Sequence, residues 1–139
     1  MAINTQLSTV AVEAEAGALA TLLNNGYIKI YSGTQPANAD TAPTGSEVVL
    51  AELRFPSIAF ASVSNGVLIS NTISPAVAVA DGTATWFRTF TSNGQTAVID
   101  GSVGTSDANL VIGSVSITQG LIVNVTSFIH TLNKFYAGT

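Results

Sequence analysis

The residues that could carry out acid–base or metal chemistry are few and scattered. The 139-residue chain holds one histidine, His130, and no cysteine, which excludes thiolate chemistry, disulfides and cysteine-containing metal sites. None of its eight acidic residues stands at the spacing of a calcium-binding loop. Asp81 and Asp100 each precede a glycine, which predicts that both serve in turns. We therefore predict no catalytic residue, no metal ligand and a structural role for His130.

Two motifs of nucleotide or hydrolase chemistry are incomplete here. Gly101 and Gly104 are spaced like part of a phosphate loop, but the lysine and the following helix that such a loop needs are missing. We expect a pair of β-turns there instead. No Gly-x-Ser-x-Gly sequence marks a serine nucleophile. The sequence predicts a protein that is not an enzyme and binds no cofactor.

The segment from Gly82 to Phe90 concentrates side chains that are common at binding interfaces. It holds the sole tryptophan, and in a strand Trp86, Arg88 and Phe90 would share one face. The Arg88 guanidinium could then stack over the Trp86 indole, and both residue types are enriched at interface hot spots. The alternative is that Trp86 anchors the core and Arg88 covers its rim. The candidate partner interface comprises Tyr27, Tyr31, Trp86, Arg88 and Phe90.

Charged residues are scarce along the whole chain. They make up 9% of it, against about 25% in a typical soluble domain, while 47% of the residues are hydrophobic. The four basic residues and the net charge of −4 are too little to neutralise the phosphates of a nucleic acid. No apolar run reaches the roughly 18 residues of a membrane span, and the first residues lack the pattern of a signal peptide. We expect a soluble chain that binds neither nucleic acid nor membrane. The basic residues are Lys29, Arg54, Arg88 and Lys134.

Residues 1–25 are predicted to form an N-terminal helix or arm, and residues 26–139 a β-domain. Alanine, leucine and glutamate are frequent over residues 9–24, and Ser8 or Thr9 could cap the start of a helix. Gly17 would lie in the middle of that helix, so the alternative is an arm that orders only against a neighbouring molecule. The apolar residues that recur at helical spacing are Val12, Ala16, Leu19 and Leu23.

After Gly26 the apolar pattern changes to a period of two, which is typical of β-strands. Five Asn-Gly or Asp-Gly pairs favour tight hairpin turns: Asn25-Gly26, Asn65-Gly66, Asp81-Gly82, Asn93-Gly94 and Asp100-Gly101. Strands are predicted near residues 27–31, 48–55, 57–63, 67–73, 76–80, 83–90, 95–99, 109–112 and 121–133, with a surface loop over residues 32–45. In the last strand Leu121, Val123, Val125 and Ile129 are expected to share the buried face. About eight or nine strands with one N-terminal helix or arm indicate an all-β fold, an antiparallel sandwich or jelly roll.

Four segments in order resemble a known family. They are GYIKIYSGTQP at residues 26–36, LAEL at 50–53, GTATWFR at 82–88 and DGSVGT at 100–105. Together they resemble the small virion proteins of tailed bacteriophages, over roughly residues 26–134. Within that group, the size and β-rich pattern are similar to the capsid cement, or decoration, proteins.

The resemblance implies a jelly-roll-like fold and a structural role on the outside of a capsid. It implies that the chain binds the major capsid protein of its own virion, as a homodimer or a trimer, after synthesis in the cytoplasm of the bacterial host. Cementing would stabilise the shell against the pressure of the packaged DNA.

Two other functions stay open at the level of the sequence. The chain could instead be a component of the phage tail or of the head-to-tail junction. It could also be a carbohydrate-binding β-sandwich in which Trp86, Tyr27 and Tyr31 stack on sugar rings.

Overall fold

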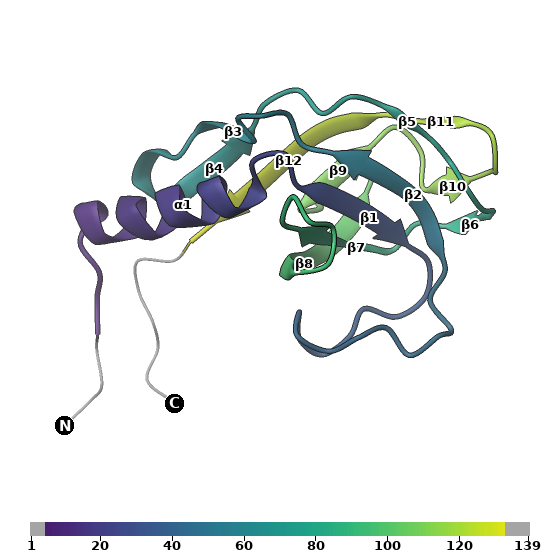
Figure 1. Ribbon diagram of the computed structural model, residues 1–139, viewed down its shortest axis with the longest axis horizontal. Coiled ribbons are helices and arrows are strands. Elements are labelled where there is room, and N and C mark those ends of the chain that lie inside the picture. The colour runs from purple at the N-terminus through teal and green to yellow at the C-terminus, as the bar shows by residue number, and fades with distance from the viewer. Residues whose placement is uncertain (1–4, 133–139) are drawn as a thin grey trace.

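The structure is a computed structural model that describes residues 5–132 (Figure 1). Residues 1–4 and 133–139 lie outside the described residues, and with them Lys134 and the end of the last predicted strand. The fold is mainly β, with 39% of residues in strands and 14% in helix, and the prediction of an all-β, sandwich-like fold with one N-terminal helix is confirmed.

The described part of the chain contains one α-helix, one short 3-10 turn and more strands than the eight or nine predicted, because several predicted strands are interrupted. The helices are α1 (Thr9–Leu23) and η1 (Ser64–Gly66). The strands are β1 (Tyr27–Tyr31), β2 (Val49–Arg54), β3 (Phe60–Ser62), β4 (Val67–Ser70), β5 (Ala76–Val77), β6 (Gly82–Thr83), β7 (Trp86–Phe90), β8 (Ala97–Gly104), β9 (Leu110–Ile112), β10 (Ser116–Ile117), β11 (Ile122–Val123) and β12 (Val125–Thr131).

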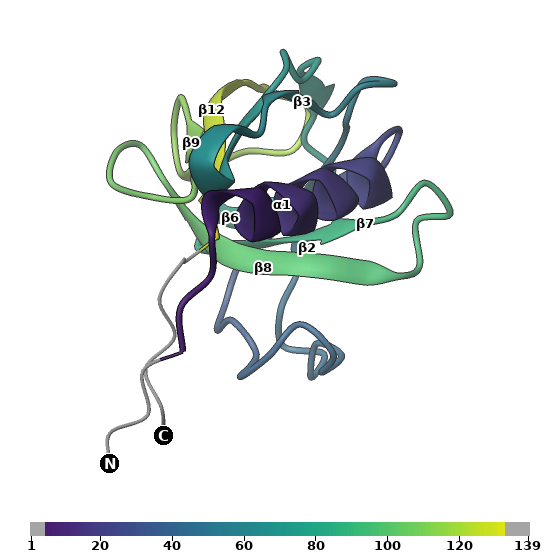
Figure 2. The same ribbon diagram turned by 90° about the vertical axis from the view of Figure 1, so that its left-hand side faces the viewer.

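Eight of these strands form one curled sheet in the order β2-β1-β7-β8-β9-β12-β4-β3. Its pairs are antiparallel except for β8 with β9, which run parallel. Figure 2 shows the two halves of the sheet on opposite sides of the core, with α1 across the opening between them. The aromatic rings of Phe55, Phe60, Phe87 and Phe128 meet there, with centroids 5.2–5.9 Å apart. The sandwich is therefore built from one sheet folded over on itself.

The helix forms where the sequence predicts it and packs on the core of its own chain. Ser8 is the N-cap, and its hydroxyl accepts a hydrogen bond of 3.1 Å from the Ala11 N–H. Val12, Ala16 and Leu23 are buried. At the other end the Asn24 side chain accepts a hydrogen bond from the Ala59 N–H at 2.8 Å, which ties the helix to the chain beyond β2.

The prediction of turns at Asp100-Gly101 and at Gly101 and Gly104 is wrong, because all three residues lie within β8. A side chain at position 101 would collide with the Phe87 ring, 2.6 Å from the place of an added Cβ. The glycine is thus required by packing across the sheet, not by a turn. Asn65-Gly66 and Asn93-Gly94 do join paired strands, whereas Asn25-Gly26 ends the helix and Asp81-Gly82 links β5 to β6, which do not pair with each other.

The expected buried face of the last strand is also partly wrong. The chain breaks between β11 and β12, and the pairing of β12 with β9 shifts between Val125 and Ser127. A bulge of this kind reverses the alternation of faces. As a result Phe128 is 1% exposed, whereas Ile129 is 43% exposed. Before the break Val123 is buried as predicted, but Leu121 precedes β11 and is 59% exposed.

We predict opposite effects of alanine at two glycines. Gly101→Ala should lower the free energy of unfolding by about 1–3 kcal/mol, because the new Cβ overlaps the Phe87 ring. Gly17→Ala should raise it by about 1 kcal/mol, because alanine is the better helix former and nothing lies within 4 Å of the added Cβ. Urea unfolding followed by the emission of Trp86 measures both values. A Gly101→Ala protein as stable as the wild type would contradict the position of this residue in β8.

A second prediction concerns His130, which lies in β12 opposite Leu68. Burial lowers the pKa of its imidazole below the ordinary value of 6.5. The unfolded chain therefore takes up the proton first, so the stability due to the neutral imidazole is present above pH 6.5 and is lost as the pH falls. Between about pH 7.5 and pH 5.5 the free energy of unfolding should fall more steeply in the wild type than in His130→Gln, in which this group is absent. Parallel pH curves for the two proteins would disprove it.

Candidate functional site

All five residues of the predicted interface lie on one face of two adjacent strands. In the antiparallel pair of β1 and β7, Tyr27 lies opposite Phe90 and Tyr31 lies opposite Trp86. Between these two pairs, Lys29 lies opposite Arg88. This face points away from the core, and we call it the outer face.

Trp86 is enclosed at one end of the outer face. Its ring stacks on that of Tyr31, with centroids 4.2 Å apart and planes 9° from parallel. The indole N–H donates a hydrogen bond to the Ser32 carbonyl at 3.3 Å, and the side chain is 1% exposed. Trp86 thus acts as an anchor within the protein, and its ring is not available to stack on a sugar.

Arg88 and Asp100 form a buried ion pair on the same face. Arg88 Nε lies 2.6 Å from Asp100 Oδ1, and Arg88 Nη2 lies 2.8 Å from Asp100 Oδ2. The two side chains are 4% and 5% exposed. Hydrogen bonding to Asp100 raises the pKa of Arg88 further above its ordinary value. The expected position of the guanidinium near the Trp86 ring is observed, at 5.4 Å from the ring centroid.

The segment of residues 32–48 covers this end of the outer face. Figure 2 shows it below the sheet, on the side away from α1. Its backbone carbonyls accept hydrogen bonds from the sheet: the Thr85 hydroxyl donates to Gly33 at 2.6 Å, and Arg88 Nη2 donates to Asn38 at 3.3 Å. The sequence predicts a surface loop over residues 32–45 of this segment. Most of its side chains are indeed exposed, but its backbone closes over Tyr31, Trp86 and Arg88.

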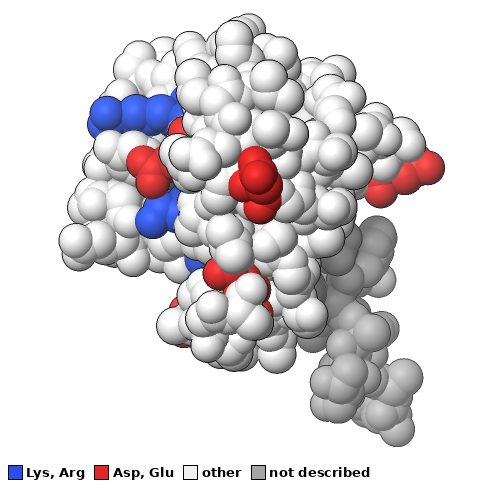
Figure 3. Space-filling view, turned by 90° about the vertical axis from the view of Figure 1, so that its right-hand side faces the viewer, with Lys and Arg blue, Asp and Glu red and all other residues white. Residues whose placement is uncertain are grey.

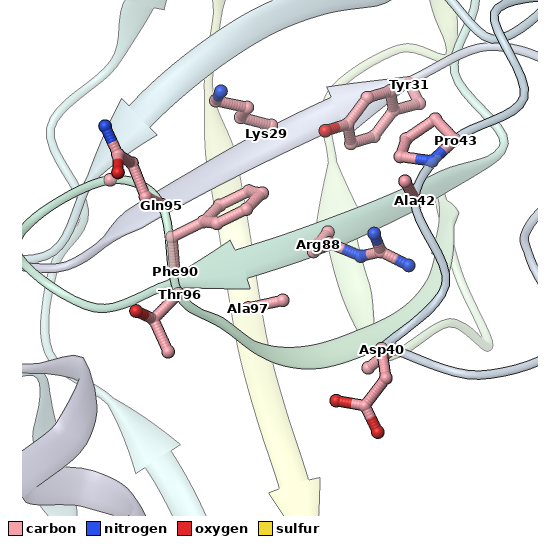
Figure 4. A pocket seen from close by; sticks show the side chains of 12 residues that line it. Lys29, Tyr31, Asp40, Ala42, Pro43, Arg88, Phe90, Gln95, Thr96 and Ala97 are labelled. Atoms are coloured by element: carbon pink, nitrogen blue, oxygen red, sulfur yellow. The ribbon is translucent and has the colours of Figure 1, made fainter.

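Beyond this cover the outer face opens into a groove of about 590 Å³ (Figure 4). Side chains of β1 and β7 form its floor, and the segment of residues 32–48 and the β7–β8 turn form its walls. Lys29 Nζ lies 4.9 Å from the centroid of the Phe90 ring and 3.9 Å from Glu52 Oε2. The groove is lined by Lys29, Tyr31, Ala39, Asp40, Ala42, Pro43, Arg88, Phe90, Gly94, Gln95, Thr96 and Ala97.

The sequence prediction missed Lys29, Asp40 and Gln95 as residues of this groove. Lys29 could have been added from the alternation of β1, which places it on the same face as Tyr27 and Tyr31. Asp40 and Gln95 belong to loops, whose path over the sheet no periodicity reveals.

A separate apolar surface lies at the end of the molecule formed by β5 and β11. Ile122 pairs with Val77, and the Ala78 N–H donates a hydrogen bond to the Leu121 carbonyl. Four side chains here are 57–64% exposed: Val77, Val79, Leu121 and Ile122. We call this surface the apolar end. Figure 3 views the molecule from this side and shows wide uncharged areas between the charged side chains.

Comparison with protein-family models, with curated proteins and with solved structures finds no match to this chain. Within residues 5–132, no three histidine or acidic side chains gather where they could hold a metal ion. The same residues contain no helix with the length and apolarity needed to cross a membrane.

The buried ion pair predicts a non-additive loss of stability. Arg88→Met leaves the Asp100 carboxylate buried without its partner, and should lower the free energy of unfolding by about 3–5 kcal/mol. Asp100→Leu should lower the free energy of unfolding by a similar amount, because it leaves the buried guanidinium without a counter-charge. The double variant should be more stable than either single variant. Urea unfolding of the wild type, the two single variants and the double variant measures this coupling. If the loss of stability in the double variant equals the sum of the two single losses, the coupling is ruled out.

Proposed function

We propose that this chain is a structural virion protein that binds the outside of a tailed-phage capsid and cements the shell. The four segments that resemble the small virion proteins support this proposal by their place in the fold. LAEL forms most of β2, GYIKIYSGTQP contains β1, GTATWFR contains most of β7, and DGSVGT lies in and just after β8. These four strands are neighbours in the order β2-β1-β7-β8. Segments far apart in the sequence thus form one continuous half of the sheet.

The apolar end is the observation that carries the proposal. Four large aliphatic side chains stay exposed there, on two short paired strands and on the residues next to them. Removing such surface from water is favourable by about 25 cal/mol per Å², and salt screens this contact little compared with an ionic one. An interface of this kind suits a protein that must hold neighbouring shell subunits together.

The proposed mechanism is mechanical. A protein that binds only the assembled shell stabilises it by mass action, by about 2.7 kcal/mol per site when its free concentration is 100 times Kd. Repeated over many sites, this resists the pressure of packaged DNA. The partner is the major capsid protein, and we propose a homodimer, with a trimer as the alternative, at the capsid exterior after synthesis in the host cytoplasm.

A tail or head-to-tail component is the second candidate, because the apolar end would serve equally well to join two virion parts. Imaging of labelled chains on particles separates the two positions: an even distribution over the head supports the cement, and a label at one vertex or along the tail supports the alternative.

We predict that Ile122→Lys weakens binding to particles that lack this chain by about tenfold or more, because a lysine ammonium in an apolar contact must lose its water. Binding is measured by co-sedimentation, and shell strength by resistance to heat and osmotic shock. Ile58→Lys is the matched control, because both isoleucines are 64% exposed and Ile58 lies outside the apolar end.

Two results would count against the proposal. Particles without the chain could resist heat and osmotic shock as well as complete ones, which would exclude a cementing role. Alternatively, Ile122→Lys and Ile58→Lys could bind alike, which would exclude the apolar end as the contact.

A further inference from the structure

The groove on the outer face presents polar groups whose hydrogen-bonding capacity is unused. Among the described residues, the Tyr31 hydroxyl, the Asp40 carboxylate and the Gln95 side-chain amide have no hydrogen-bond partner in the protein. Figure 4 shows the Tyr31 hydroxyl pointing towards the side of the groove where Lys29 lies. The groove therefore offers donors and acceptors together, on a floor whose geometry is fixed by the stack of Tyr31 on Trp86.

The charges of the groove favour a neutral ligand. Arg88 is already neutralised by Asp100, through two hydrogen bonds of 2.6 and 2.8 Å. Of the other charged side chains in the lining, Lys29 is basic and Asp40 is acidic. An anion bound there would meet Asp40 and a cation would meet Lys29, whereas the separate hydroxyl groups of a neutral ligand can donate to Asp40 and accept from Lys29.

The floor of the groove also distinguishes a sugar from an extended peptide. Peptides that add to a sheet pair with the backbone of an open edge strand. Here the floor is the face of β1 and β7, both of which are paired on each side. Pro43 and the exposed part of Phe90, a residue 8% exposed with Lys29 Nζ 4.9 Å from its ring centroid, supply a small apolar surface beside the polar groups. A pyranose ring likewise combines an apolar C–H face with a rim of hydroxyls. The volume of about 590 Å³ suits a small ligand of this kind.

We infer that this groove binds a short neutral oligosaccharide. The ligand lies on the floor of the groove beside Phe90 and against Pro43, with its hydroxyls hydrogen-bonded to Tyr31, Asp40, Gln95 and Lys29. This site differs from the sugar-binding site that the sequence suggests, in which sugar rings stack on Trp86, because the Trp86 ring is enclosed. It uses a different surface from the apolar end, so it does not depend on the proposed role in a capsid.

The test screens the full chain on an array of neutral, sialylated and sulfated oligosaccharides, and then titrates the best neutral member by NMR. Tyr31→Phe removes the hydroxyl and keeps the ring on Trp86, and Gln95→Ala removes the amide. Each should weaken binding about threefold to tenfold, the effect of one lost hydrogen bond. The matched controls are Gln119→Ala and Gln6→Ala, whose side chains are exposed and lie outside the groove, and which should bind as the wild type does.

The emission of Trp86 shows whether each variant has kept the fold around the groove. Binding of a neutral oligosaccharide that falls in both groove variants and not in the controls would support the inference. It would be overturned if no neutral member binds, if sialylated or sulfated members bind better, or if the folded groove variants bind as tightly as the controls.

Discussion

The ion pair of Arg88 and Asp100 is the constraint on which the outer face depends. A charged pair with side chains only 4% and 5% exposed must be held in good geometry, because its desolvation is costly. The pairing register meets this demand by placing Arg88 directly opposite Asp100 in β7 and β8. The guanidinium also donates to the Asn38 carbonyl, so the same interaction positions the segment of residues 32–48. One buried contact thus links the register of β7 and β8 to the loop cover and to the wall of the groove.

The local periodicity of the sequence was enough to predict the class of the fold. The helix begins at Thr9 as predicted, and the alternation in β1 correctly buries Ile28 and Ile30. Asp100-Gly101 shows where local rules fail. An Asp-Gly pair favours a turn in isolation, but Gly101 leaves room for the Phe87 ring and Asp100 neutralises Arg88. Both are contacts between neighbouring strands of the sheet, and the residues next to this pair in the sequence do not reveal them.

Local periodicity also predicts part of the candidate site, and contacts across the sheet again account for the part that it misses. A period of two places Trp86, Arg88 and Phe90 on one face, and Tyr27 and Tyr31 on one face, as observed. That β1 pairs with β7, across more than fifty residues of sequence, is a matter of topology and not of pattern. The enclosure of Trp86 and the opening of the groove depend in turn on the path of a loop. Small residues and prolines let its backbone lie close to the sheet, but they do not determine where it lies.

The scarcity of charged residues has different consequences on the outer face and at the apolar end. On the outer face, the ionic groups are used within the protein: Arg88 with Asp100, and Lys29 near Glu52 and over the Phe90 ring. The polar groups that have no hydrogen-bond partner there are either neutral, like the Tyr31 hydroxyl, or offset by a side chain of opposite charge. At the apolar end, by contrast, the exposed side chains of Val77 and Ile122 form a mainly hydrophobic surface. A chain with so few charges can bind through shape, apolar contact and neutral hydrogen bonds, and these are the interactions that its two open surfaces provide.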